Sequence, residues 1–223
     1  MQTFQTPAAI TAVVEIPAGH IRLAAADRAD TTVEVRPAHA SSSRDVKAAK
    51  ETTVAFADGV LRIESPEAKN QLFGSGGSVE ITVRLPAGSH VEAKAAAADL
   101  RSTGRLGDVA FSSAQGPVEL DEAASVRLTL QDGDITVGRM DGSAELTTAR
   151  GDLRIAEARG SQAVLTTQSG SITVGVAPGV SAALDAGSTH GRIANSLRNT
   201  GGAEAALMIR ATTSHGDITA HSN

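Results

Sequence analysis

The sequence predicts an all-β protein, a single-stranded β-solenoid with coils of about 18–21 residues and an irregular N-terminal half. The first observation behind this prediction is a short phrase that recurs in the second half of the chain. In it, a glycine is followed by one variable residue and then by aliphatic residues at alternate positions. The recurring glycines are Gly116, Gly133, Gly151, Gly170, Gly191 and Gly216. A repeat of roughly twenty residues is typical of solenoids, in which each unit stacks on the next.

The second observation is that apolar residues occupy fixed offsets from each glycine. Around Gly151, for example, Ala144 and Leu146 precede the glycine and Leu153 follows it. These offsets share one parity, so the side chains leave the same face of an extended strand. Each unit is therefore predicted to be a strand, a tight corner at the glycine, a second strand and a looser return. An antiparallel β-sandwich with frequent glycine turns is the alternative fold.

The same register continues into the N-terminal half with less regularity. Strands are predicted on both sides of Ala98, Gly59 and Gly19, and after Gly77. An extra strand is predicted over Thr32–Arg36.

Two loops interrupt this half of the chain. The polar segment Pro37–Lys50 is predicted to be a surface insertion with one helical turn, and Asn70–Gly77 is rich in glycine and serine. We therefore expect one domain over residues 1–223, with irregular strands and two loops over 1–97 and regular repeats over 98–220.

Composition excludes several classes of function. The chain has no cysteine, which removes disulfides, thiolate catalysis and thiolate metal sites. Its net charge is −5, its basic residues are scattered and only 2% of its residues are aromatic, so nucleic-acid binding is not expected. It has no apolar run of the length that spans a membrane. Because its first residues do not resemble a signal peptide, we expect a cytoplasmic protein, with export or envelope association as the alternative.

One constellation has the residue types of a metal site. His190 and His215 each precede a glycine of the repeat, and Asp217 follows the second of these glycines. If the two coils are neighbours, the imidazoles lie one strand apart, and two histidines with a carboxylate can hold Zn²⁺. The alternative is a pair of exposed loop histidines that recurs because the unit recurs.

The aspartates that follow the glycines allow two interpretations. Asp134, Asp152 and Asp217 fall in one column, with Ser171 and Arg192 at the equivalent positions of other units. A ladder of carboxylates can bind Ca²⁺. Aspartate after glycine is also common turn chemistry, in which the side chain bonds to its own backbone. The chain lacks the nine-residue calcium repeat, so turn chemistry is the preferred interpretation.

No catalytic constellation is recognisable. The sequence has no nucleophile elbow after a strand, no phosphate-binding loop and no aromatic platform for sugars. Ser75, between two glycines, has no evident base partner. We therefore expect no catalytic residues and no cofactor.

The strand–Gly-Asp-Ile-Thr-Val pattern, with the opening Ile16–Leu23 and Thr32–Val35, resembles the DUF4097 family of bacterial β-strand-repeat proteins. That family is sometimes labelled as adhesins and is related to the toast-rack domains. The resemblance covers roughly residues 8–220 and implies a β-solenoid of uncharacterised function, with no functional residues to carry over. The alanine-rich composition is typical of actinobacteria. Relatives that carry membrane segments are linked with envelope-stress sensing and protein assembly.

These observations predict a non-enzymatic structural or interaction module whose partner is another protein or a second copy of itself. The last strand ends near Ala220, so we expect the C-terminal coil to expose unpaired strand edges that favour end-to-end dimers, with face-to-face dimers as an alternative. A metal- or carbohydrate-binding β-helix protein and a surface adhesin are the alternative functions.

Overall fold

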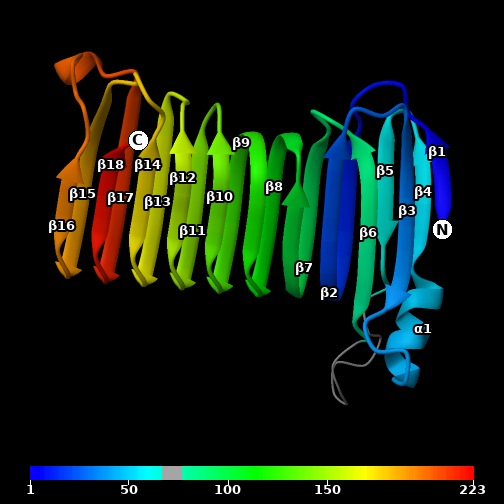
Figure 1. Cartoon of the computed structure of the whole chain (residues 1–223). Coiled ribbons are helices and arrows are strands. Elements are labelled where there is room, and N and C mark those ends of the chain that lie inside the picture. The colour runs from blue at the N-terminus through cyan, green and yellow to red at the C-terminus, as the bar shows by residue number, and fades with distance from the viewer. Residues whose placement is uncertain (67–76) are drawn as a thin grey trace. The chain divides into compact units, whose positions relative to one another are not determined.

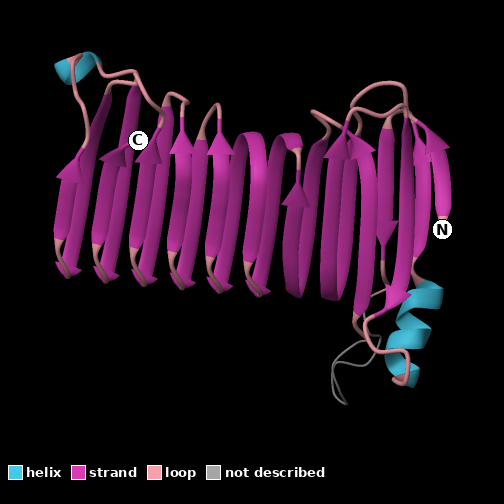
Figure 2. Cartoon of the chain, viewed as in Figure 1, coloured by secondary structure: helices cyan, strands magenta, loops and turns pink. Residues whose placement is uncertain are grey.

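The structure is a computed structural model that describes residues 1–66 and 77–223. Most of the predicted second loop, including Ser75, lies outside the described residues. The chain divides into two compact units, Met1–Gly116 and Pro117–Asn223, which are described separately (Figure 1). The expectation of a single domain stays a prediction. Both units consist almost entirely of strands (Figure 2), as the sequence predicts.

The C-terminal unit is the regular one. Its strands and one short 3₁₀ helix are β9 (Val118–Asp132), β10 (Ile135–Met140), β11 (Ala144–Arg150), β12 (Leu153–Ala158), β13 (Gln162–Ser169), β14 (Ile172–Val176), β15 (Ala182–His190), β16 (Ile193–Ser196), η1 (Gly202–Glu204), β17 (Leu207–His215) and β18 (Ile218–Ser222). Each coil contributes one strand to each of two parallel ladders. One ladder runs β9, β10, β12, β14, β18, β16, and the other runs β9, β11, β13, β17, β15.

Glycine is required at the corners because successive coils stack closely there. Gly151 has a φ of 139°, and a Cβ added to it would lie 2.1 Å from the carbonyl oxygen of Gly133 in the neighbouring coil. Gly170 repeats this approach to Gly151 at 2.0 Å. The threonine three positions before the corner reinforces the stack, since the Thr148 hydroxyl donates to the Gly133 carbonyl at 3.3 Å. The predicted glycine corner is confirmed.

The coils do not stack in chain order. The last coil of the chain, β17 and β18, lies between β13 and β14 on one side and β15 and β16 on the other. The expectation that the C-terminal coil has free edges is therefore wrong, and the coil before it is the outermost one.

Core composition explains this order. The inner positions of the last coil carry buried aliphatic residues such as Ile209, Ile218 and Ala220. In the outermost coil the residue opposite Ala220 is Asn195. Burying an amide without hydrogen-bond partners costs roughly 1–3 kcal/mol, so the coil with the polar residue is more stable at the end of the stack.

The N-terminal unit combines coils with antiparallel strands. Its elements are β1 (Gln2–Gln5), β2 (Thr11–Ala26), β3 (Asp30–Pro37), α1 (Ser43–Glu51), β4 (Thr53–Ala57), β5 (Val60–Glu64), β6 (Val79–Pro86), β7 (His90–Thr103) and β8 (Arg105–Gln115). One ladder runs β1, β3, β6, β2, β7, and the other runs β4, β5, β2, β7, β8. The first coil of the chain, β2, is thus also an inner one.

Two predictions for this unit need correction. Gly59 is not a solenoid corner: with Asp58 it forms the turn of an antiparallel β4–β5 hairpin, and both residues have positive φ (51° and 76°). The insertion carries α1, a helix of nine residues rather than a single turn. The extra strand predicted over Thr32–Arg36 is confirmed as part of β3.

Asp45 anchors α1 to the unit. Its carboxylate accepts hydrogen bonds from the backbone N–H groups of Ser78 at 3.0 Å and His39 at 3.2 Å, and lies 3.1 Å from the His39 Nδ1. These contacts, the Ser78 N–H foremost, lower the pKa of Asp45 below its ordinary value. The Ser42 hydroxyl caps the helix by accepting from the Asp45 N–H at 3.3 Å.

Aliphatic side chains between the two ladders of each unit form a thin core. The positions seven and five residues before each repeat glycine are buried in every coil of the repeat except the one that contains Gly191, where Leu184 and Ala186 are half-buried. Among the described residues, no helix has the length and apolar character needed to cross a membrane.

Candidate functional site at the open coil

The outermost coil of the C-terminal unit, which we call the open coil, consists of β15 and β16. Within the described residues, β15 pairs only with β17 and β16 pairs only with β18 (Figure 1, orange). All four residues of β16 are exposed, and Ile193, whose equivalents are buried in the other coils, is 46% exposed. The open coil therefore presents two strand edges and the uncovered end of the core between them.

The predicted histidine pair lies at the corner of this coil. His190 of β15 is the register partner of His215 of β17, so the two side chains lie on adjacent strands. Their rings stack with centroids 4.8 Å apart and planes inclined by only 3°. Both imidazoles are exposed, so the stack is a surface contact between the open coil and its neighbour.

Asp217 does not complete a metal site in this arrangement. Its carboxylate accepts the Arg192 N–H at 2.8 Å, and a second oxygen lies 3.5 Å from the Arg192 guanidinium. The backbone N–H of Arg192, followed by its charge, lowers the pKa of Asp217. Among the described residues, no group of three histidine, aspartate or glutamate side chains is placed to hold a metal ion.

The orientation of the two imidazole rings also does not suit a shared metal ion. The lone pair of an imidazole lies in the plane of its ring, so two parallel stacked rings direct their lone pairs along parallel lines. Ligands to one Zn²⁺ must instead converge on a point about 2 Å from each nitrogen. The zinc hypothesis for His190, His215 and Asp217 therefore stays a prediction, and it requires one ring to rotate.

The aspartates of the corner column hold neighbouring coils together. Asp134 accepts the Asp152 N–H at 2.8 Å, and Asp152 in turn accepts the Ser171 N–H at 2.7 Å. Asp217 and Arg192 repeat this bond at the open coil. These side chains bond to the backbone of the next coil and not, as turn chemistry predicts, to their own. Their role in the described structure is to fix the stacking of corners.

Charged residues on the outer faces of the C-terminal unit form pairs across strands. Arg150 lies 2.8 Å from Asp132, and Arg139 lies between Glu122 (3.3 Å) and Glu157 (3.6 Å). Such exposed cross-strand pairs each contribute roughly 0.2–1 kcal/mol. These pairs therefore link neighbouring strands on the outer faces.

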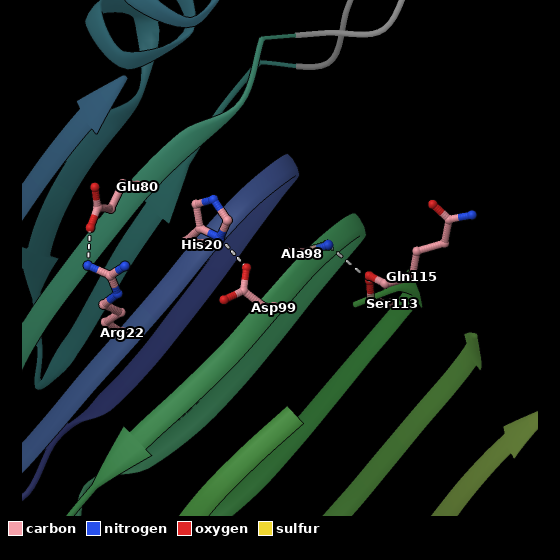
Figure 3. Close-up of polar contacts among 7 residues, drawn as sticks. All are labelled: His20, Arg22, Glu80, Ala98, Asp99, Ser113 and Gln115. Carbon is pink, nitrogen blue, oxygen red and sulfur yellow. Dashed lines mark hydrogen bonds and ion pairs between the residues drawn. The ribbon is translucent and has the colours of Figure 1, made fainter. Parts of the chain in front are cut away.

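A polar cluster on the N-terminal unit was not predicted. His20 of β2 pairs with Asp99 of β7, and Arg22 of β2 pairs with Glu80 of β6 (Figure 3). His20 and Asp99 each follow a corner residue, so their shared offset was a signal available in the sequence. The signal was missed because β2 and β7 are neighbours in space but not in chain order.

This cluster does not form a nucleophilic triad. The nearby serine, Ser113, accepts the Ala98 N–H at 3.3 Å and donates to the Gln115 carbonyl at 2.8 Å (Figure 3). Its hydroxyl thus links two backbone segments at a corner and is not directed at His20. A serine nucleophile requires a base within hydrogen-bond reach.

Comparison with known proteins identifies the family. A family model described as Toastrack DUF4097 matches residues 13–222, which is most of the chain. The chain belongs to the DUF4097 family. The match extends over both units of this DUF4097 protein, and the resemblance inferred from the glycine phrase is confirmed. No curated protein is similar enough in sequence to be matched.

Several solved structures are similar to this chain over nearly its whole length. A crystal structure from Bacteroides fragilis, described as a "putative adhesin", is 13% identical, covers 98% of this chain and 95% of its own, and has a TM-score of 0.56. A "putative adhesin" from Parabacteroides merdae is 10% identical over 98% of this chain and 94% of its own, with a TM-score of 0.49. A "Putative lipid binding protein" from Parabacteroides distasonis is 13% identical over 98% and 95%, with a TM-score of 0.46. The first of these shows a common fold and nothing about ligand or partner.

Proposed function

We propose that this DUF4097 protein is a non-enzymatic interaction module and that the open coil is its binding surface. The observation that carries this proposal is that β15 and β16 are each paired on one side only. An unpaired strand edge presents N–H and C=O groups to which an additional strand can bind. The partner is another protein or a second copy of the chain.

Pairing among the polar side chains supports a binding role over a catalytic one. The corner carboxylates of Asp134, Asp152 and Asp217 accept backbone N–H groups, and Arg139 and Arg150 of the outer faces pair with carboxylates on neighbouring strands. Catalytic groups converge instead on a site where a substrate can lie. The open coil offers backbone edges and exposed aliphatic surface, which suit strand addition.

Substituting a proline at the edge tests the proposal. Proline at Ala186 removes one backbone N–H of β15, whereas the matched variant Ala186→Val keeps this group. Affinity capture from the native host, followed by identification of the bound protein, is expected to recover one partner with the wild type and with Ala186→Val but not with Ala186→Pro. Circular dichroism and thermal unfolding verify that all three proteins are folded. Equal recovery of the partner by Ala186→Pro contradicts the assignment of the open coil.

We also propose that the protein acts in the cytoplasm. An adhesin role requires export, so fractionation of the native host separates the two possibilities. Recovery from the cytosolic fraction supports an intracellular partner, whereas recovery from the cell surface contradicts this location and favours an adhesin.

A further inference from the structure

We infer that the partner of the open coil is a second copy of this chain, bound through antiparallel pairing of β15 with its equivalent about a two-fold axis at Ala186. This inference rests on the proposed function, because it names the partner for the same surface. Four features of the open coil support this inference. They are its two unpaired strand edges, the direction of its free backbone groups, the position of the one charged residue along β15, and the fact that a two-fold contact forms a dimer that cannot grow further.

The first feature is that both ladders of the C-terminal unit end in the same coil. The core is left open between them: Leu184 and Ala186 of β15 are half-buried, and Ile193 of β16 is 46% exposed. A single extended peptide would pair with one strand and leave the other strand and the core end uncovered. A second open coil has two strands and aliphatic side chains between them, so it covers both edges at once.

The second feature is the direction of the free backbone groups. The Ala182 N–H donates not to β17 but to the carbonyl of Arg198, in the segment that follows β16, at 3.1 Å. Peptide groups alternate in direction along a strand, so the N–H and C=O groups of Leu184, Ala186 and Ser188 also point away from β17. Arg198 occupies the edge at Ala182, which leaves the stretch from Ala183 to Thr189 free for a partner strand.

The third feature, the charge on β15, selects the register. Only Asp185 is charged within the free stretch, and it lies 3.2 Å from Arg210 of the neighbouring strand. An axis at Asp185 would place the two carboxylates opposite each other, which is unfavourable. With the axis at Ala186, Asp185 of each copy faces Gly187 of the other, and Leu184 faces Ser188. Gly187 leaves space there, since no atom lies within 4 Å of a Cβ added to it.

The fourth feature is closure. A two-fold contact uses the same surface on both copies, so it ends at a dimer and does not continue into a fibre. The inference therefore predicts a defined dimer and not a series of larger assemblies.

Two substitutions at one position test the partner and the register together. Because Gly187 has open space and no positive φ, both Gly187→Lys and Gly187→Asp are expected to fold as the wild type does. Lysine would face Asp185 of the second copy, and aspartate would repel it. The contact occurs twice in the dimer, so dimer affinity is expected to rise roughly twofold to thirtyfold with lysine and to fall by a similar factor with aspartate.

The measurement is sedimentation velocity with the full purified chain over a concentration series, with Ala186→Pro as the edge-blocked variant. A dimer that strengthens in Gly187→Lys, weakens in Gly187→Asp and is lost in Ala186→Pro supports the inference. A wild type that stays monomeric at high concentration, or a dimer that both Gly187 variants change in the same direction, overturns it. If the wild type is monomeric but Ala186→Pro still loses a captured host protein, the inference fails and the proposed function stands. If the dimer behaves as expected and no other protein is captured, the open coil binds only a second copy of this chain.

Discussion

A methyl group at Gly151 tests the close stacking of corners. In Gly151→Ala the new Cβ would lie 2.1 Å from the Gly133 carbonyl oxygen and 2.5 Å from its carbon, and the residue would have to keep a φ of 139°. A residue other than glycine in this region is strained by about 1–3 kcal/mol. Relieving the contact requires the coils to separate at the corner. That movement stretches the Asp152 N–H bond to Asp134 and the Thr148 bond to Gly133, each worth about 1 kcal/mol.

The expected loss is therefore about 3–5 kcal/mol in the free energy of unfolding, from the strain and the two hydrogen bonds together. Urea unfolding followed by circular dichroism measures it. Gly187→Ala is the matched control, because its Cβ meets no atom within 4 Å, and its unfolding is expected to stay within about 0.5 kcal/mol of the wild type. A loss of less than about 1 kcal/mol in Gly151→Ala would refute the argument that backbone approach dictates glycine at the corners.

Three further predictions concern the core, α1 and the histidine pair. Leu146 is fully buried, so Leu146→Ala is expected to lower the free energy of unfolding in urea by about 2–5 kcal/mol. Ile193 of the open coil is exposed, so Ile193→Ala is expected to lower it by less than about 1 kcal/mol. Similar losses in the two variants would contradict the assignment of the open coil. The lowered pKa of Asp45 means that its contribution to stability is complete above the ordinary pKa of 3.8 and is lost as pH falls through the lowered value, so the protection of α1 amides relative to their intrinsic exchange at the same pH should fall in acid. In Asp45→Asn this protection should already be low at neutral pH and show no acid step, and unchanged protection in this variant would remove the anchoring role. If the histidine pair binds Zn²⁺, added zinc should raise the melting temperature of the wild type but not that of His190→Ala/His215→Ala, and equal responses would dismiss the site.

Much of the fold was predictable because it rests on local, repeated patterns. The glycines fix the corners, and alternate aliphatic residues such as Leu146 and Leu153 define the inner face of each strand. These features act within one coil, so the sequence reports them directly. The repeat pattern wrongly predicted a solenoid corner at Gly59, where an Asp-Gly turn connects the two strands of an antiparallel hairpin. Turn residues with positive φ serve both structures, and only the direction of the paired strand distinguishes them.

The candidate site was only partly predictable. The equivalent positions of His190 and His215 indicated that the two rings are close, because equivalent residues of stacked coils are neighbours. The parallel orientation of the rings depends on side-chain torsions, which no sequence pattern reports. His20 and Asp99 illustrate the opposite case, in which the offsets agreed but the stacking of β2 on β7 was not foreseeable.

The sequence alone determined the coil: its strands, its glycine corner, its aliphatic core and its membership of a repeat family. The tertiary structure alone decided the order in which the coils stack, and therefore which strands are paired on one side only. The physical reason is that the strands of every coil present nearly the same backbone edges and aliphatic side chains to their neighbours. The local sequence pattern therefore allows several stacking orders of the coils. The choice is made by the summed burial of whole coils, which places the coil with Asn195 at the open end and the more apolar C-terminal coil inside.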